Sequence, residues 1–336
     1  MKFALSSEQR DFAGSLRKMC DAAGTPGIIR AWAGGDHRSG RGLIRQLAGA
    51  GALGLAVDEE YGGMGAEAID LVVALREIGR AAVPGPLVET AAAIPALLQA
   101  LPDKAAARRW LAALADGHAL GTLALTPDAP AVDADTAEVV LVADGDRVSI
   151  GHRTDLIRSV DSARRLFTVV ADDVVAEGDG VRAAIDAAFD AGALAAAAQA
   201  LGAGRALLET SVDYVKQRHQ FGKPIGQYQA IKHHLSNAMI GLEMAEPLLY
   251  RAALSADSAD RARDVSAAKL ACSEAAYRTA RTALQVHGAI GYTAEYDLSL
   301  WLTKVTALRS AWGTADFHRA RIGDALRADT DRKGRA

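Results

Sequence analysis

The chain has 336 residues, of which 50% are hydrophobic and 24% charged, so it is long enough for two or three domains with a sizeable core. A net charge of −3 provides no basic field, which argues against nucleic-acid binding. The two cysteines, Cys20 and Cys272, lie far apart and outside any CxxC pattern, so we expect neither disulfides nor a cysteine metal site, and a reducing, cytoplasmic location.

The sequence predicts no signal peptide and no membrane span. The first ten residues carry Lys2, Glu8 and Arg10 where a signal peptide would need an apolar run. The alanine-rich stretch 187–204 is interrupted by Asp190 and Gln199. We therefore expect no membrane among the partners of this chain.

Residues 1–117 are predicted to form an N-terminal helical domain. Ser6 or Ser7 can cap the first helix, and Pro84-Gly85-Pro86 interrupts a later one. The glycines that follow Tyr61 permit positive φ, so a tight turn between helices is expected there. Apolar residues then recur at helical intervals, namely Ile69, Leu71, Val72, Leu75 and Ile78.

Residues 118–180 are predicted to form a shortened middle β domain. Short runs rich in valine, leucine and threonine cover residues 120–125, 137–143, 147–150 and 166–171. Asp144-Gly145, between two of these runs, is a hairpin signal.

Residues 181–327 return to helix, and residues 328–336 form a charged tail that we expect to be frayed. The helix after Gln229 carries the apolar stripe of a bundle helix: Ile231, Leu235, Ala238, Leu242, Ala245, Leu249 and Ala252. A second core stripe is predicted in the next helix at Leu270, Tyr277 and Leu284.

Residues 218–229, between two of these helices, are predicted to form a functional loop. Gly222, Pro224 and Gly226 break helical periodicity within five residues. Arg218 supplies a fork-shaped positive charge beside backbone amides that glycine leaves accessible, which suits a phosphate or pyrophosphate. An ordinary interhelical loop with a surface arginine is the alternative interpretation of so short a pattern.

Two further motifs accompany this loop, Glu59-Glu60-Tyr61-Gly62-Gly63 before it and Gln285-Val286-His287-Gly288-Ala289-Ile290-Gly291-Tyr292 after it. In this order and spacing the three resemble the acyl-CoA dehydrogenase family, with its EEYGG, RxxFGxxIxxYQ and QxHGxxGY patterns. The resemblance covers nearly the whole chain. It implies a mainly α fold with a small β domain: an N-terminal helical domain, a middle β domain and a C-terminal four-helix bundle.

The resemblance is weakest in the middle of the chain. Relatives hold the flavin ring there with an AxTEPxxGSD segment and a WITN-like strand. Residues 124–130 keep the threonine, Thr126, but lack the glutamate and the GSD, and no counterpart of the second strand is found. We therefore expect an incomplete cradle for the flavin ring.

The activity that the resemblance implies is FAD-dependent α,β-dehydrogenation of an acyl-CoA thioester, with electrons passing to an electron-transfer flavoprotein. The α-proton is weakly acidic, so a positioned carboxylate must remove it while the β-hydrogen leaves as hydride to the flavin. Relatives place this glutamate at one of two positions, which fall on Trp312 and Gly192. Neither residue can accept a proton, so no catalytic residue is expected in this chain.

Four carboxylates are candidate substitutes for the base, although charge on a helix is most simply solvated. Glu246 is the most interesting, because it stands where relatives often carry arginine. The others are Asp190, Glu243 and Asp316. A metal site is not expected, because His233 and His234 are adjacent and cannot share a metal from one helical face.

In the family, FAD lies across a subunit interface, and the resemblance implies that one half of that site is present here. The residues that it implies as FAD contacts are Arg218, Gln220, Phe221, Gln229, Gln285, His287, Gly288 and Gly291. A chain with these contacts but without the base and the ring cradle is what a dedicated partner subunit would show.

We therefore expect a subunit of a heterotetrameric acyl-CoA dehydrogenase whose second subunit supplies the base. It resembles the smaller, base-less subunits of the α2β2 enzymes that actinobacteria use on steroid side chains. Two alternatives remain open: a self-sufficient homotetrameric dehydrogenase with a relocated base, and a non-catalytic scaffold or acyl-CoA-binding protein.

Overall fold

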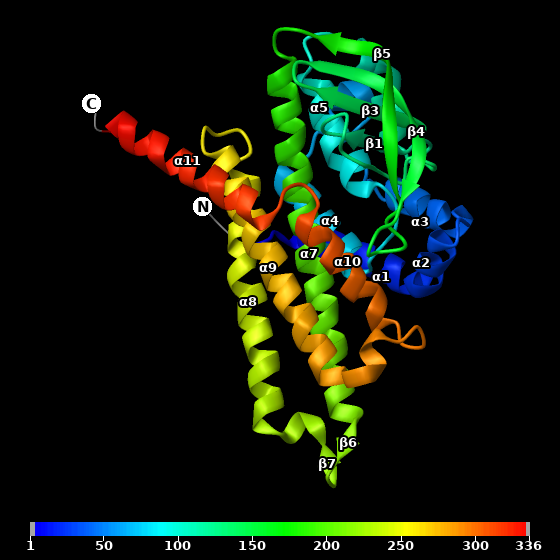
Figure 1. Ribbon diagram of the computed structural model, residues 1–336, viewed down its shortest axis with the longest axis vertical. Helices are drawn as coiled ribbons and strands as arrows, with labels where there is room; N and C mark the ends of the chain where they lie inside the picture. Colours follow the sequence, from blue (N-terminus) through cyan, green and yellow to red (C-terminus); the bar gives the residue numbers. More distant parts are fainter. Residues whose placement is uncertain (1–3, 334–336) are drawn as a thin grey trace.

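The computed structural model describes residues 4–333, which form three parts around one long helix, α7 (Val181–Gln217). The N-terminal helices and a five-stranded sheet surround the first half of α7, and a helical bundle is built on its second half (Figure 1). The expected architecture, mainly helical with a small β domain, is confirmed.

The N-terminal part is helical because its segments combine apolar faces with good end signals. Ser6 caps the first helix: its hydroxyl accepts from the Gln9 amide at 3.2 Å, and the Gln9 side chain accepts from the Ser6 amide at 3.0 Å. The helices are α1 (Ser7–Ala23), α2 (Thr25–Ala33), α3 (Arg38–Gly49), α4 (Ala68–Arg80), α5 (Ile94–Ala100) and α6 (Ala105–Ala115). Two short turns complete this part, η1 (Glu59–Tyr61) and the π-helical turn η2 (Glu89–Ala93).

The tight turn expected after Tyr61 is present and depends on glycine. Gly62 has φ 83°, a left-handed conformation that glycine adopts without strain. A Cβ on Gly63 would lie 2.0 Å from the Val57 carbonyl oxygen, so only glycine allows the chain to fold back so closely.

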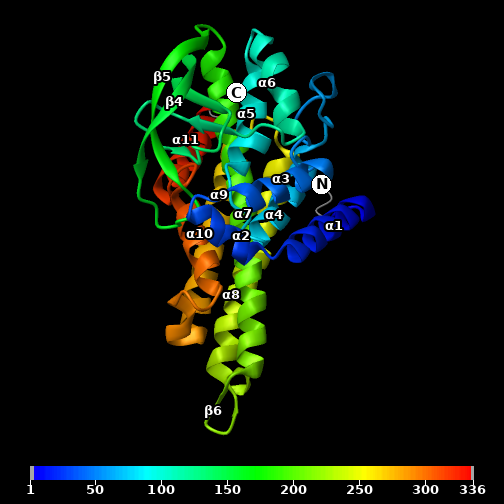
Figure 2. The same cartoon turned by 90° about the vertical axis from the view of Figure 1, so that its right-hand side faces the viewer.

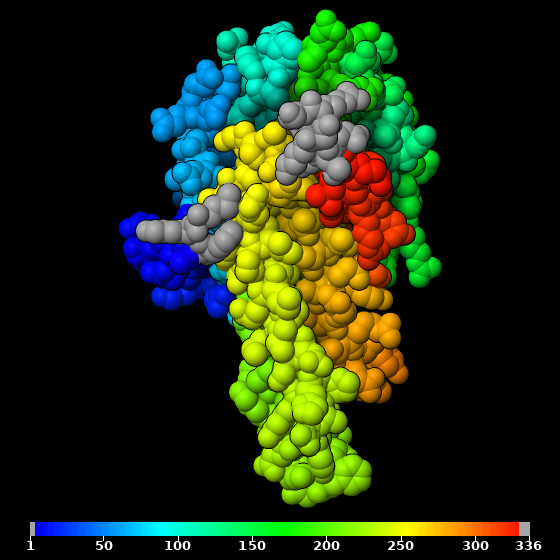
Figure 3. All heavy atoms as spheres, turned by 90° about the vertical axis from the view of Figure 1, so that its left-hand side faces the viewer, coloured from blue at the N-terminus to red at the C-terminus, as the bar shows by residue number. Residues whose placement is uncertain are grey.

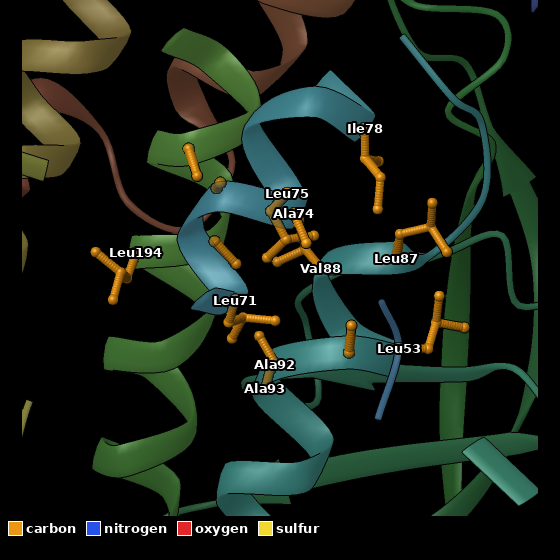
Figure 4. Packing of buried hydrophobic residues seen from close by; sticks show 14 of the residues in the cluster. Leu53, Leu71, Ala74, Leu75, Ile78, Leu87, Val88, Ala92, Ala93 and Leu194 are labelled. Carbon is orange, nitrogen blue, oxygen red and sulfur yellow. The ribbon is translucent and has the colours of Figure 1, made fainter. Parts of the chain in front are cut away.

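The main core lies where α4 meets the segment that contains η2 and α5. Leu71 and Leu75 of α4 point toward Ala92 and Val88, and Ile78 points toward Leu87 (Figure 4). Each of these side chains is at most 6% exposed. Burial of a leucine or isoleucine stabilises the fold by about 1.5–3 kcal/mol. This face of α4 is the one that the sequence periodicity predicted.

The middle part is one sheet with strand order β1-β3-β4-β5-β2. β1 and β3 pair in parallel, and the other pairs are antiparallel. The strands are β1 (Gly121–Ala124), β2 (Ala131–Val132), β3 (Val139–Asp144), β4 (Arg147–Ile157) and β5 (Leu166–Glu177).

β4 and β5 are longer than the sequence predicted, which placed their ends at residues 150 and 171. The additional residues are mostly exposed, so the hydrophobic pattern stops before the strands do. Backbone pairing carries the two strands on as a ribbon, with irregular register at Ser149 and Arg153.

The C-terminal part is a four-helix bundle of α7, α8 (Gln229–Leu254), α9 (Arg261–His287) and α10 (Leu298–Ser310), followed by α11 (Ala315–Lys333). A small hairpin, β6 (His219–Gln220) and β7 (Lys223–Pro224), and the turn η3 (Ile225–Gln227) connect α7 to α8. The turn η4 (Gly288–Tyr292) follows α9. The hairpin is the outermost point at this end of the bundle (Figure 2).

α4 and α7 cross at very close range because each presents a glycine to the other. A Cβ on Gly79 would lie 2.2 Å from the Gln199 carbonyl oxygen, and a Cβ on Gly202 would lie 1.9 Å from the Arg76 carbonyl oxygen. The crossing joins the N-terminal part rigidly to the bundle.

α7 is more apolar than the sequence interpretation allowed. Despite Asp190 and Gln199, α7 is long and apolar enough to cross a membrane. However, 83% of its most apolar 18-residue stretch is buried inside the protein. That burial is typical of the core helix of a folded domain.

Two smaller expectations about the bundle are wrong. Leu270, Tyr277 and Leu284 of α9 are only half-buried, because the alanines beside them, such as Ala276 and Ala280, form the buried face. The tail is not frayed from residue 328, because α11 continues to Lys333.

Candidate flavin contacts and catalytic positions

The loop 218–229 is a hairpin with a tight turn at its tip. Phe221 has φ 51° and Gly222 has φ 80°, and positive φ at both central residues is the requirement of a type I′ turn. His219 pairs with Pro224, and Gln220 pairs with Lys223. Glycine takes this conformation freely, whereas Phe221 is held in a sparsely populated region that is often found at functional sites.

The hairpin leaves its candidate FAD-contacting side chains exposed. Arg218, Gln220 and Gln229 are exposed, and the side chain of Phe221 is 91% exposed. Within residues 4–333 the Arg218 guanidinium makes no hydrogen bond or ion pair. A free guanidinium beside an exposed aromatic ring can bind an anion carried by another molecule.

The second motif ends α9, where His287 is buried and stacked on Tyr214. The two ring centroids lie 4.1 Å apart with an interplanar angle of 27°. His287 Nδ1 lies 2.8 Å from the Ala283 carbonyl oxygen and donates to it. His287 Nε2 is then an acceptor, and among the described residues it has no partner. Burial lowers the pKa of His287, which keeps the ring neutral.

The remaining residues of this motif shape the turn after α9. Gly288 has φ 65° and ψ −145°, which is accessible essentially to glycine alone. Gly291 is buried, and a Cβ there would lie 3.1 Å from that of His287. Gln285, one turn from the helix end, is exposed.

Tyr214 brings the two motifs together. It lies one helical turn before Arg218, and its hydroxyl donates to the His287 carbonyl oxygen at 3.5 Å. The RxxFG and QxHGxxGY segments therefore occupy the same end of the bundle. Tyr214 was not singled out by the sequence, where it is one aromatic residue on a helix.

The two positions at which the family resemblance places the base, Gly192 and Trp312, meet at a different place, beside the first half of α7. A Cβ on Gly192 would lie 2.4 Å from Cε3 and Cζ3 of the Trp312 ring. Trp312 is 8% exposed, as expected for a residue that fills the core. Its Nε1 donates to Glu89 Oε1 at 3.2 Å.

Glu89 is a buried carboxylate at this place that the sequence reasoning missed. It lies in η2 and is 4% exposed, and burial raises its pKa. A single charge within the apolar run Leu87–Ile94 was the available signal, but helix periodicity alone does not tell which side of the helix is buried.

Glu89 belongs to a group of buried charges where the three parts of the chain meet. Glu89, Asp133 and Lys304 are buried, and together with the half-buried Arg164 they line a cavity of about 20 Å³ next to Trp312. Burial raises the pKa of Asp133 to about 7 and lowers that of Lys304, whose Nζ donates to the Val83 carbonyl oxygen at 2.9 Å. The volume is about that of one water molecule.

The four substitute carboxylates lie in ion pairs. Glu246 pairs with Arg76 at 2.7 Å and with Arg205 at 2.8 Å, so its charge joins α8 to α4 and α7. Glu243 pairs with the same Arg205 at 2.8 Å. The hydrogen bonds of both glutamates are directed to these arginines and, for Glu246, to Tyr250.

Asp190 and Asp316 differ sharply in their surroundings. The carboxylate of Asp190 is not on a solvated face: it is 3% exposed and pairs with Arg261 at 2.9 Å and with Arg321 at 2.5 Å. Asp316 is 94% exposed and pairs with Arg319. Residues 4–333 contain no group of three or more His, Cys, Asp or Glu side chains that could hold a metal ion.

Comparisons with known proteins agree with this architecture. Residues 6–118 match the acyl-CoA dehydrogenase N-terminal domain, and residues 178–327 match the acyl-CoA dehydrogenase C-terminal domain. The chain is 33% identical to acyl-CoA dehydrogenase IpdE2 of Mycobacterium tuberculosis over 284 residues, which cover 83% of this chain and 85% of the relative.

Two solved structures are similar over nearly their whole length. One is a Tcur3481-Tcur3483 steroid ACAD G363A variant, with 25% identity, a TM-score of 0.85, and 96% of this chain and 99% of the other covered. The ChsE4-ChsE5 complex from Mycobacterium tuberculosis has 22% identity, a TM-score of 0.84, and coverages of 97% and 99%. The chain belongs to the acyl-CoA dehydrogenase family, whose members are FAD-dependent oxidoreductases.

FAD fits this chain in part. The free, exposed Arg218 guanidinium suits the phosphate groups of the adenosine diphosphate half, whereas the unpaired His287 Nε2 is buried within this chain. The cavity of about 20 Å³ at Trp312 can hold neither the isoalloxazine ring nor a thioester. The candidate contacts therefore suit one half of the cofactor, and the cavity at Trp312 has no room for the other half.

Proposed function

We propose that the chain is the base-less subunit of a heteromeric acyl-CoA dehydrogenase. The observation that carries this proposal is the contrast between its two sites. The hairpin presents unpaired candidate FAD contacts outward, whereas Trp312 fills the place of the base. The similar ChsE4-ChsE5 complex, which contains two kinds of subunit, supports such an assembly.

In this assembly, Arg218, Gln220, Phe221, Gln229, Gln285, His287, Gly288 and Gly291 contact the adenosine diphosphate half of an FAD whose ring lies in the partner subunit. When bound, FAD would supply the acceptor for the substrate hydride, and an electron-transfer flavoprotein would take up the electrons. The partner subunit supplies the carboxylate that removes the α-proton.

The substrate is an acyl-CoA thioester, and we infer a steroid side chain as its acyl group. The support is the description of the Tcur3481-Tcur3483 structure as a steroid ACAD, at 25% identity. The two free, buried cysteines fit a reducing, cytoplasmic setting.

The outer face of α8 supports a partner subunit as well. Ile240, Met244 and Leu248 recur every four residues and are 51%, 71% and 41% exposed. α8 runs along the surface of the molecule in the space-filling view (Figure 3). An apolar stripe on an outer bundle helix is a surface that another protein chain would cover.

A self-sufficient dehydrogenase is the second candidate, and Glu89 is the observation that favours it. Its raised pKa and its place beside Trp312 suit a general base. It ranks second because Glu89 already accepts the Trp312 N–H and the adjoining cavity leaves no room for a substrate.

The test is to purify the full chain alone and together with an acyl-CoA dehydrogenase subunit that keeps the glutamate. We expect the chain alone to be flavin-poor and the complex to carry flavin and oxidise an acyl-CoA. Changing the partner's glutamate to glutamine should lower turnover by about 10²–10⁴ with flavin still bound. Glu246→Gln and Glu89→Gln in this chain should each leave turnover within a few-fold of the parent.

The opposite result is equally clear. A homotetramer of this chain that binds one FAD per chain and reduces it with an acyl-CoA would favour the second candidate. A hundredfold loss in Glu89→Gln at normal flavin content would identify the base. A chain that takes up no flavin with any such partner would favour a scaffold.

A further inference from the structure

Trp312 does more than replace a missing glutamate. We propose that Trp312 is a plug that closes the acyl cavity of this chain, with Gly192 as the matching socket, so that no acyl group enters between its own catalytic positions. The inference rests on the proposed function only in assigning the acyl group to the partner.

The position of the plug follows from the chemistry of the base. A general base must lie within hydrogen-bond reach of the α-proton, so both base positions border the place where the acyl group is bound. Here the Trp312 ring occupies the space of the Gly192 side chain, 2.4 Å from where its Cβ would be. The two positions therefore cannot change independently.

Trp312 is held both through its ring and through its backbone. Its Nε1 donates to Glu89 Oε1, and the Trp312 carbonyl oxygen accepts from His318 Nε2 at 2.9 Å. Phe189 packs beside it, with ring centroids 6.3 Å apart. Trp312 also has φ 58°, a strained conformation for a bulky residue that persists only where its surroundings fix it.

The plug leaves too little space for a ligand. The adjoining cavity of about 20 Å³ is lined by Glu89, Gln199 and Lys304 beside Trp312. Small-molecule sites are usually some 300–1,000 Å³. Removal of the indole group would open a space on the order of 150 Å³, enough for a small aromatic molecule.

The first test is a double-mutant cycle in the full chain, followed by thermal unfolding. Gly192→Ala should lower the Tm by about 5 °C, because its Cβ would collide with a rigid ring. Trp312→Ala should lower it by on the order of 10 °C. In the Trp312→Ala background, Gly192→Ala should lower the Tm no further, because the clash is gone and alanine favours the helix.

The second test uses indole as the probe. Indole should raise the Tm of Trp312→Ala saturably and leave that of the parent unchanged. 1-Methylindole, which has no N–H to donate to Glu89, should be weaker. Trp312→Phe should keep most of the cavity closed and respond little to indole. Trp312→Phe also replaces Trp312→Ala in the cycle if that variant fails to fold. In the Trp312→Phe background, Gly192→Ala should lower the Tm less than it does in the parent.

A plug is ruled out if Gly192→Ala leaves the Tm of the parent unchanged. It is also ruled out if Gly192→Ala lowers the Tm equally with and without the Trp312 ring. Failure of Trp312→Ala to respond to indole overturns it as well. These measurements do not depend on a partner. If the chain gives the expected results here but never takes up flavin in a complex, the plug is supported and the proposed function is contradicted.

Discussion

We propose that Arg218 is the residue on which flavin binding depends most. Its guanidinium makes no ion pair within the described chain, so no ion pair has to break when it binds a phosphate. A charge-assisted contact of this kind contributes about 1.5–3 kcal/mol. We expect Arg218→Ala to weaken flavin retention in the assembled complex by roughly tenfold to a hundredfold, measured by dialysis against free FAD.

The controls for Arg218 separate charge from geometry. Arg218→Lys keeps the charge but loses the two-pronged donor, so an intermediate loss is expected. Arg45→Ala removes another exposed arginine, on α3, and should have no effect. Equal flavin retention in Arg218→Ala and the parent would remove this residue from the site.

Among the elements, the crossing of α4 and α7 is the least tolerant contact. A Cβ on Gly202 would lie 1.9 Å from the Arg76 carbonyl oxygen, and backbone cannot move aside as a side chain can. We expect Gly202→Ala to lower the free energy of unfolding by about 3 kcal/mol, measured by urea denaturation.

Gly14 of α1 provides the matched control for this prediction. It lies in a helix with nothing within 4 Å of its would-be Cβ. Gly14→Ala should therefore stabilise the chain by up to about 1 kcal/mol, because alanine is the better helix former. Similar effects at both glycines would mean that α4 and α7 do not pack as closely as described.

The whole molecule exposes an apolar stripe on α8, and assembly should depend on it. Met244, at its centre, is 71% exposed and is not needed for the fold of the chain. Met244→Lys would bury a charge in the proposed interface, so we expect at least about a tenfold weaker association with the partner and an unchanged Tm of the isolated chain. Analytical ultracentrifugation measures the first quantity.

Ser15→Lys on α1 is the control for Met244, since it adds the same charge to another exposed helix. It should leave association unchanged. If the complex forms equally well with Met244→Lys, the stripe on α8 is not the surface that the partner covers.

The sequence by itself determined the family, the three-part architecture and the motifs of the candidate flavin site. These features depend on local order along the chain: glycines that force turns at residues 62 and 222, a capping box at Ser6, and a helical stripe on α4. The ends of the strands and the buried face of α9 were harder to predict from the sequence. In exposed strands and alanine-rich helices, the buried and exposed positions differ little in hydrophobicity.

Only the tertiary structure decided what occupies the catalytic positions and what surrounds them. Gly192 and Trp312 are 120 positions apart in the sequence, and Glu89 is farther still from Trp312, yet the Trp312 ring packs on Gly192 and hydrogen-bonds to Glu89. Asp190 likewise changes from an apparently solvated helix charge to a buried ion pair with two arginines. Such contacts depend on how helices distant in sequence pack against one another, and periodicity within a single helix carries no information about its neighbour.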